Sequence, residues 1–250
     1  MEEITKSVYT DWTFWSFAVA GLALLLSQLP PIKSWFRGGR LRIDIFAKMH
    51  ITHRIGNPNA QVHILLTNAG NRAVQVKAIS LEFVRDGGMR FEIPAINYLT
   101  TPSDNSPTLL TAFTIQPQSD WGHLVNFIGA LTREQEREYK QLEGPLRAEL
   151  IRLRALPENT DRLVTVDPQF YQQFLPIFNA RFVWLPGEYQ VRLKVNAYPE
   201  SASKEATFRV TIFESDSAEL RGYTNDYNSG AGISWHSKTH VGVLLNVNAT

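Results

Sequence analysis

The sequence predicts a mainly β protein in which a single N-terminal transmembrane helix precedes a β-sandwich that carries a helical insert. Three observations lead to this fold class. No charged residue occurs between Asp11 and Lys33, which is typical of a membrane span. Most of the remaining chain alternates apolar and polar residues in short segments separated by turns, as the strands of a sandwich do. A helical pattern interrupts these segments at residues 132–156.

The predicted transmembrane helix occupies residues 12–32, after a short tail at residues 1–11. At 1.5 Å per residue, the apolar run from Trp12 to Leu29 covers roughly 27 Å of a hydrocarbon core about 30 Å thick. Two consecutive prolines follow the run and predict its end. Aromatic and basic residues near both ends are typical of a membrane interface. The predicted interface residues are Trp12, Trp15, Trp35, Arg37 and Arg40.

Residues 33–40 form a basic juxtamembrane linker, in which Gly38 and Gly39 predict a flexible joint. Because basic flanks are retained on the cytoplasmic side, we expect a single-pass protein of the inner (plasma) membrane with a cytoplasmic C-terminal domain. A domain on the outer side is the alternative. A cleaved signal peptide fits less well, because acidic residues dominate the segment before the span.

Four small residues lie along one face of the predicted helix, at spacings of four, three and four: Ser16, Ala20, Ala23 and Ser27. Helices associate in membranes through close backbone approach and polar contacts. This face therefore predicts self-association or docking with a partner's helix. The alternative is that these residues only fill space.

The strongest strand pattern runs through residues 188–197, where every second residue is apolar. A second alternating segment at residues 207–212 follows a turn-rich stretch, so the two predict a hairpin. Further strands are predicted at residues 89–93, 109–115 and 121–128.

An earlier strand at residues 62–66 ends at the turn sequence Asn68-Ala69-Gly70-Asn71, which predicts a second hairpin with the segment that follows. In that following segment the apolar residues change from even to odd positions near Lys77 and Ala78. A β-bulge there would keep one face toward the core.

Two stretches resemble known modules. Leu185-Pro186-Gly187-Glu188-Tyr189 and the strand after it look like the turn and late strand of immunoglobulin-like and fibronectin-like modules, and Leu66 to Asn71 looks like an early hairpin of bacterial modules in that group. The resemblance applies to a domain at residues 41–214 and implies an immunoglobulin-like β-sandwich that binds a partner or acts as a spacer. It carries over no catalytic residues.

The helical insert at residues 132–156 begins with Thr132 and Gln135 at the spacing of a capping box. Pro145 predicts two helices or one kinked helix. A narrow stripe of leucines follows, for which packing on the sandwich and a groove for a partner helix are the two interpretations. The stripe comprises Leu142, Leu146, Leu150 and Leu153.

A dense aromatic cluster follows the insert. It either closes one end of the core or forms an exposed patch that recognises a partner. The candidate patch consists of Phe170, Tyr171, Phe174 and Phe178. The C-terminal tail at residues 215–250 contains a short helical pattern, and its apolar end at 241–247 either adds an edge strand or stays loose.

The composition and the motifs limit the kinds of partner and site that we expect in this protein. The 250 residues carry 25 Lys and Arg against 24 Asp and Glu, and no cysteine, so we expect no nucleic-acid partner, no disulfide and no thiolate metal site. In a strand, His50 and His53 would point to opposite faces. His236 and His240 have helical spacing but lie in a glycine-rich segment. We therefore predict no catalytic residue, no metal site and no cofactor.

The first functional hypothesis is a membrane-anchored β-sandwich that binds a protein partner, or acts as a scaffold, at the membrane surface. In this hypothesis residues 12–32 contact lipid, and the protein associates with a partner or with itself. Two alternatives are an enzyme whose site combines the tail histidines with distant carboxylates, and an outward-facing envelope or adhesion module. A cluster of titratable groups in one pocket would favour the enzyme.

Overall fold

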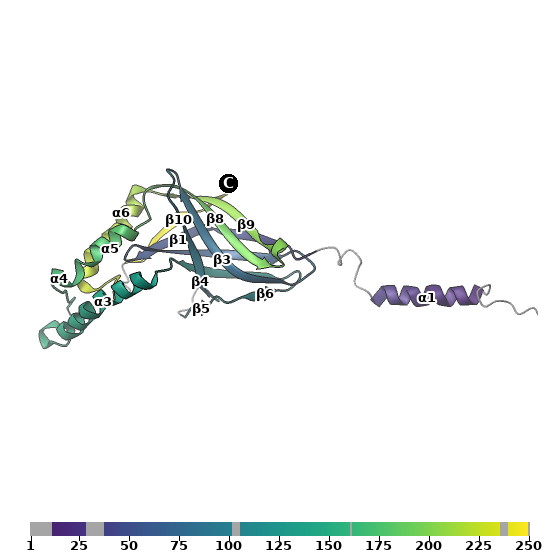
Figure 1. The fold of residues 1–250 in the computed structure, drawn as a ribbon, viewed down its shortest axis with the longest axis horizontal. Coiled ribbons are helices and arrows are strands. Elements are labelled where there is room, and N and C mark those ends of the chain that lie inside the picture. Colours follow the sequence, from purple (N-terminus) through teal and green to yellow (C-terminus); the bar gives the residue numbers. More distant parts are fainter. Residues whose placement is uncertain (1–11, 29–37, 102–105, 161, 236–239, 250) are drawn as a thin grey trace, which may run out of the picture.

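The computed structural model describes residues 12–28, 38–101, 106–160, 162–235 and 240–249. These residues form one antiparallel sheet of 11 strands, and Figure 1 shows helices α3 to α6 gathered at one end of it. The strand order is β10-β1-β2-β7-β4-β3-β8-β9-β11, with β5 beside β4 and β6 beside β3. The strands are β1 (Leu41–Arg54), β2 (Asn57–Asn68), β3 (Val74–Arg85), β4 (Arg90–Leu99), β5 (Thr108–Leu109), β6 (Phe113–Ile115), β7 (Asp120–Ile128), β8 (Gly187–Tyr198), β9 (Lys204–Ile212), β10 (Val243–Asn246) and β11 (Asn248–Ala249).

The sheet folds over on itself at β4. Residues 90–94 of β4 pair with β3, whereas residues 95–99 pair with β7 after a register shift between Ala95 and Asn97. The mainly β, antiparallel fold is therefore confirmed. The two separate sheets of an immunoglobulin-like sandwich are not what forms, because β4 joins both layers into one continuous path.

The C-terminal tail brings the two ends of this path together. β10 pairs with β1, and β11 pairs with β9 only two residues further along the chain. The edge strand expected from the apolar end of the tail is thus present as two short strands. They leave the sheet nearly closed.

The alternating patterns predicted β8 and β9 correctly. In β8 the inward residues Tyr189, Val191 and Leu193 are fully buried, and in β9 Phe208 and Val210 are buried as well. The two strands pair from end to end as the expected hairpin. The predicted bulge is also present, because the pairing of β3 with β8 shifts register between Val76 and Ala78.

The second predicted hairpin is wrong. β2 pairs with β1 and β7, whereas β3 pairs with β4, β6 and β8. The turn after β2 carries the chain from one layer to the other instead of back along β2. The buried Asn68 side chain holds this crossing, because its Nδ2 donates to the carbonyl oxygens of Arg72 at 2.8 Å and Ile115 at 3.1 Å.

The flexible joint predicted at Gly38 and Gly39 is wrong for Gly39, which is buried. A Cβ at Gly39 would lie 2.3 Å from Cγ2 of Val74, and a Cβ at Gly70 would lie 2.4 Å from the carbonyl oxygen of Gly38. The chain therefore enters the domain through a close backbone contact that only glycines allow. The amide of Ala69 donates to the carbonyl oxygen of Arg40 at 2.9 Å and fixes the same contact.

The helical insert is the single helix α3 (Arg133–Arg154), which continues through Pro145. The predicted capping box is confirmed, since Thr132 Oγ1 accepts from the Gln135 amide and Gln135 Oε1 accepts from the Thr132 amide. Leu146 and Leu150 are buried in the common core, so the leucine stripe packs on the domain. The shorter helices are α4 (Pro168–Tyr171), α5 (Phe174–Arg181), α6 (Glu214–Gly222) and the 3-10 helices η2 (Pro157–Asn159), η3 (Glu200–Ala202) and η4 (Tyr223–Ser229).

The apolar N-terminal segment forms α1 (Trp12–Gln28), 17 residues long. Residues 29–32 of the predicted span lie outside the described residues. Among the residues that the structure describes, no helix combines the length and the apolar character needed to cross a membrane. The prediction of a transmembrane helix is therefore not supported by the fold.

Candidate functional site

The helices at one end of the sheet enclose a small cavity between the end of β1 and the C-terminal segment. We call it the cap pocket. Its volume is about 70 Å³. Strand β1 supplies residues 52–54, the turn after it supplies Ile55, β2 supplies Asn59, and η4 supplies two tyrosines. The cap pocket is lined by Thr52, His53, Arg54, Ile55, Asn59, Tyr223, Tyr227, Gly232 and His240.

Local backbone geometry brings the C-terminal segment back over the pocket. Gly230 ends η4 in the left-handed region, with φ of +81°. A Cβ at this position would lie 2.4 Å from Cδ1 of Leu150 on α3. Glycine therefore allows both the turn and the close approach to α3.

His240 is the most chemically distinctive residue of the pocket. Its Nε2 lies 2.7 Å from Oδ2 of Asp226 on η4, and only 9% of its side chain is exposed. The ring stacks on Tyr223 with a centroid distance of 4.2 Å, and the Tyr223 hydroxyl accepts from the amide of Gly242 at 2.9 Å. An imidazole paired with a carboxylate in this way is the arrangement that acid–base sites use.

His53 is buried beside His240 and has a different character. Burial lowers the pKa of His53 to about 4, so the ring is neutral at pH 7. Its Nε2 lies 2.7 Å from the carbonyl oxygen of Leu220, and its Nδ1 accepts from the amide of Gly56 at 3.2 Å. Both ring nitrogens have partners, and His53 is therefore a structural residue in the lining of the pocket.

Three residues that line the cap pocket each carry a buried polar atom with no hydrogen-bond partner in the part of the chain that the structure describes: Asn59 Oδ1, Tyr227 Oη and His240 Nδ1. Among the described residues only one further buried side-chain atom is in this state, Nδ1 of His123 in β7. Leaving such a group unpaired costs about 1–3 kcal/mol. Burial raises the pKa of Tyr227, so its hydroxyl stays protonated and can donate. The pocket is thus prepared to hydrogen-bond something other than the chain itself.

Arg54 closes the pocket on the side of α3. Its Nη2 donates to the carbonyl oxygen of Ile233 at 2.8 Å and to the hydroxyl of Tyr139. The Tyr139 hydroxyl donates to the same carbonyl oxygen at 2.8 Å, and the guanidinium lies over the Tyr139 ring. Both oxygens that Arg54 contacts here are neutral, and the carboxylate of Glu143 also acts on the Tyr139 hydroxyl.

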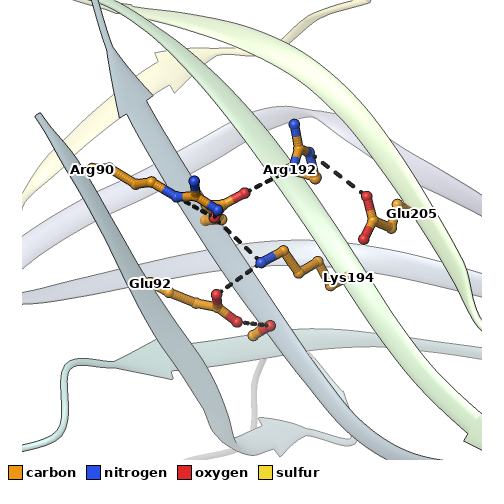
Figure 2. A network of polar contacts seen from close by, with 7 residues as sticks. Arg90, Glu92, Arg192, Lys194 and Glu205 are labelled. Atoms are coloured by element: carbon orange, nitrogen blue, oxygen red, sulfur yellow. Dashed lines mark hydrogen bonds and ion pairs between the residues drawn. The ribbon is translucent and has the colours of Figure 1, made fainter. Parts of the chain in front are cut away.

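A second polar cluster lies on the outer face of β3, β4, β8 and β9, as Figure 2 shows. Its centre is Glu82, whose side chain is 2% exposed. The carboxylate contacts Arg90, Arg192 at 3.1 Å and Lys194 at 3.3 Å. Burial raises the pKa of the Glu82 carboxyl, but the hydrogen bonds and charges of Arg90 and Lys194 outweigh burial and hold this pKa below its ordinary value.

The outer members of this cluster are Glu92 and Glu205. Lys194 Nζ contacts Oε2 of Glu92 at 2.8 Å, and Arg192 Nε lies 3.7 Å from Oε2 of Glu205. Three cations thus face three carboxylates across four strands. The cluster is balanced in charge and serves to join the strands, so we do not assign it a ligand.

The predicted partner patch is not an exposed surface. Phe174 and Phe178 of α5 are buried, and Phe170 and Tyr171 of α4 are half-buried. Phe178 packs against His53 and Tyr227, so the cluster forms the inner wall behind the cap pocket. Their positions agree with the other interpretation of this cluster, in which the aromatic residues close one end of the core.

The predicted membrane-interface and helix-packing residues stay separate from this site. Trp12 and Trp15 are exposed on α1, Arg40 is exposed just before β1, and Trp35 and Arg37 lie outside the described residues. On α1, the hydroxyls of Ser16 and Ser27 donate to the carbonyl oxygens of Trp12 and Leu24. The four small residues of α1 are all exposed: Ser16, Ala20, Ala23 and Ser27.

Four histidines were weighed from the sequence: His50, His53, His236 and His240. His50 and His53 do occupy opposite faces of β1, with only His53 buried. His240 enters the pocket, whereas His236 lies outside the described residues. Within the described ranges no group of three or more metal-ligating side chains comes together. Sequence reasoning missed Asn59, Asp226 and Tyr227, because no spacing links residues that meet only through the fold.

Comparisons with known proteins add no family. No family model and no curated protein matches the chain. Among solved structures, the sporulation control protein Spo0M from Bacillus subtilis is similar at 12% identity and a TM-score of 0.30, covering 76% of this chain and 55% of that chain. A protein from Archaeoglobus fulgidus is similar at 8% identity and a TM-score of 0.26, covering 69% of this chain and 92% of that one. The chain is thus similar in part to these β-rich structures. The proposed function is based on the pockets of this chain.

Proposed function

We propose that this chain is a binding module, held at a membrane by α1, whose cap pocket recognises a small polar ligand. The observation that carries the proposal is that three residues lining one cavity each carry a buried polar atom without a partner among the described residues: Asn59 Oδ1, Tyr227 Oη and His240 Nδ1. Buried polar groups are otherwise almost always paired. A ligand or ordered water that pairs them recovers the cost of burying them, which supports recognition as the purpose of the pocket.

The membrane part of the proposal rests on α1. Every α1 side chain whose exposure the structure describes is exposed, and the helix contains no charged residue. An exposed apolar surface of this extent usually contacts another molecule, and we propose that α1 contacts lipid. The small face at Ala20 and Ala23 additionally suits self-association or a partner's helix.

The domain separates the pocket from the membrane attachment. The chain enters β1 at Leu41, and the pocket residues lie at the other end of this 14-residue strand, roughly 40 Å away at about 3.3 Å per residue. The pocket therefore lies about one strand length from the point where the chain enters the domain. With the basic residues that follow α1 kept in the cytoplasm, the pocket would face the cytoplasm, where the bound ligand could govern contact with a protein partner.

An enzyme is the second candidate, and a specific observation favours it. His240 and Asp226 form an imidazole–carboxylate pair, and the other ring nitrogen of His240 has no partner among the described residues. A ring held in this way can accept a proton from a bound molecule. Turnover of a ligand over time, in place of simple binding, is the result that distinguishes the enzyme from the binding module.

The pocket is tested with the full chain in a mild detergent and a panel of small carboxylates, amines, amides and polyols, using the thermal midpoint and proton NMR of each compound. At least one class should raise the midpoint in a saturable manner. His240→Phe keeps a ring against Tyr223 but removes both ring nitrogens, and it should abolish the effect. The matched control is His63→Phe on the exposed outer face of β2, which should respond like the unchanged protein. An equal response of His240→Phe, or no response to any class, would overturn the proposal.

A further inference from the structure

We infer that a groove on the outer face of the sheet binds a neutral polyhydroxyl ligand of the sugar class. This groove, which we call the amide groove, lies across β1, β2 and β7, and its ligand is independent of the one proposed for the cap pocket. Its volume is about 230 Å³. The amide groove is lined by His50, Thr52, Asn59, Ala60, Gln61, Asn126, Phe127 and Ile128.

Strand alternation directs the polar side chains of the amide groove outward. Ile51 of β1, Val62 of β2 and Phe127 of β7 are fully buried. Successive side chains of a strand point to opposite faces of the sheet. The residue before each of these three therefore points away from the core: His50, Gln61 and Asn126.

Three amide side chains form a hydrogen-bonded row across neighbouring strands. Gln61 lies directly opposite Asn126, and Asn126 lies opposite Asn97 of β4. Gln61 Nε2 donates to Asn126 Oδ1 at 2.7 Å, and Asn126 Nδ2 donates to Asn97 Oδ1 at 2.6 Å. These bonds hold Gln61 and Asn126 in place before a ligand arrives, which lowers the cost of ordering them on binding.

Several polar groups of the groove are open to a ligand. Within the described part of the chain, Gln61 Oε1 and the Thr52 hydroxyl make no hydrogen bond, and Asn59 Oδ1 is buried without a partner. His50 Nε2 donates to the carbonyl oxygen of Val241, which leaves Nδ1 as the ring nitrogen that can meet a ligand. A hydroxyl group both donates and accepts, so it can pair with each of these groups.

The charge of the lining selects a neutral ligand. None of the residues that line the groove is Asp, Glu, Lys or Arg. A charged ligand would lose hydration here without gaining an opposite charge, which is costly. A sugar instead offers several hydroxyl groups and no charge.

The groove also offers apolar surface and sufficient room. Ile128 lines it, and the exposed ring of Phe46 packs with its edge against His63, which lies two residues after Gln61 on the same outer face. Such side chains can contact the C–H groups of a sugar ring. A volume of about 230 Å³ is roughly eight times the share of one water in the liquid, which is of the order of one sugar ring.

The experiment uses the full chain in a detergent without a sugar headgroup, because a glycoside detergent would itself compete for the groove. Methyl glucoside, methyl galactoside and methyl mannoside are the neutral probes, and glucosamine and glucuronate are the cationic and anionic probes with the same kind of ring. The readouts are saturation-transfer NMR of each probe and the side-chain amide resonances of the ¹⁵N-labelled protein. At least one neutral probe should bind in a saturable manner and shift the Gln61 and Asn126 side-chain resonances. The charged probes should bind about tenfold or more weakly, because their charge has no partner in the groove.

Matched variants test the position of the site. Asn126→Ala removes the centre of the amide row and should weaken sugar binding by about tenfold, and Gln61→Ala should weaken it by about three- to tenfold. If Asn126→Ala does not fold, Gln61→Ala carries the test. The control is Gln75→Ala at an exposed position on β3, which should bind like the unchanged protein.

The variant His240→Phe separates the two sites, because Gln61 and Asn126 do not line the cap pocket. It should bind the sugar like the unchanged protein. Loss of sugar binding in His240→Phe, with normal binding in Gln61→Ala, would place the sugar in the cap pocket and overturn the amide groove. Equal binding of the charged probes, or no binding of any neutral probe, would also overturn it and would leave the proposed function to its own test.

Discussion

Tyr227 places a hydroxyl at a fully buried position without a partner among the described residues, where an apolar ring would be more stable. We predict that Tyr227→Phe raises the free energy of unfolding by about 1 kcal/mol, because it removes the cost of an unpaired buried group. The measurement is urea unfolding of the full chain without added ligand.

Tyr189 supplies the matched control for this prediction. It is equally buried, but its hydroxyl lies 3.0 Å from the Val183 carbonyl oxygen and 2.8 Å from the Leu185 carbonyl oxygen, and it accepts from the Leu185 amide at 3.1 Å. Tyr189→Phe should therefore lower the free energy of unfolding by about 1–2 kcal/mol. Destabilisation by both substitutions would show that the Tyr227 hydroxyl has a partner after all.

His53 makes stability depend on pH. Its pKa is about 4 in the folded protein and about 6.5 in an unfolded chain, so the folded state binds fewer protons between these values. The contribution of neutral His53 is fully present above about pH 6.5 and is lost as the pH falls toward about 4. The total is roughly 3 kcal/mol.

NMR titration of the histidine side chains checks this assignment directly. The His53 resonances should stay constant from pH 8 to about 5.5, because the buried ring stays neutral until the pH approaches its lowered pKa. A midpoint near 6.5 for His53 would contradict its burial as a neutral ring. Only the orientation of His53 was predictable from sequence, because alternation in β1 fixes its face but not its neighbours on α5 and α6.

Glu82 joins two neighbouring elements to β3, through Arg90 of β4 and through Arg192 and Lys194 of β8. We predict that Glu82→Gln destabilises the protein by about 1–3 kcal/mol, because three cations lose their common partner. Since the folded pKa of Glu82 is depressed, its contribution is present at neutral pH and is lost as the pH falls below about 4.5.

Glu205→Gln is the matched control, because Glu205 is 57% exposed and contacts only the edge of the cluster. An exposed pair of this kind contributes about 0–1 kcal/mol. Chemical unfolding at pH 7 and pH 4 separates the two variants, and the difference between them should shrink at the lower pH. Equal effects at pH 7 would mean that the buried carboxylate is not the centre of the cluster.

At the scale of elements, the sequence predicts the strands and helix ends that depend on residues close together in the chain. Alternation identified β8 and β9, and the capping box identified the start of α3, because both depend on residues close together in the chain. The hairpin after Asn68 was predicted wrongly because a turn sequence specifies a bend and not the strand that follows it. The side-chain bonds of Asn68 to Arg72 and Ile115 decide the crossing, and Ile115 lies too far along the chain to be recognised.

At the scale of the whole molecule, closure of the sheet explains why the cap pocket could not be predicted. Asn59 from β2, Asp226 from η4 and His240 before β10 meet only after the tail has paired with β1 and β9. From the sequence, the tail histidines entered only the alternative hypothesis of an enzyme; His240 lines the pocket, and His236 lies outside the described residues. The sequence offers no means of choosing the carboxylate that accompanies them.

The membrane attachment proposed for α1 predicts where the full chain is found. Replacing Leu22 and Leu24 by Asp should move the protein from the membrane fraction to the soluble fraction, because each charge costs about 2.5–3.5 kcal/mol within the apolar core. The control is Leu109→Asp at an exposed apolar position on β5, which should remain with the membrane. If the unchanged protein is recovered in the soluble fraction, α1 is not an anchor.

Orientation gives the last prediction of the proposed membrane attachment, in which the basic residues after α1 decide the side of the membrane that the cap pocket faces. Four of them, Lys33, Arg37, Arg40 and Arg42, follow α1, whereas the tail before it is predominantly acidic. Basic flanks resist translocation, so protease added to intact spheroplasts should leave the domain uncut and should digest it once the membrane is opened. Replacing Lys33 and Arg37 by Glu, with two lysines added to the N-terminal tail, should weaken this protection. Digestion of the unchanged protein in intact spheroplasts would place the pocket outside, where its ligand would be an extracellular molecule.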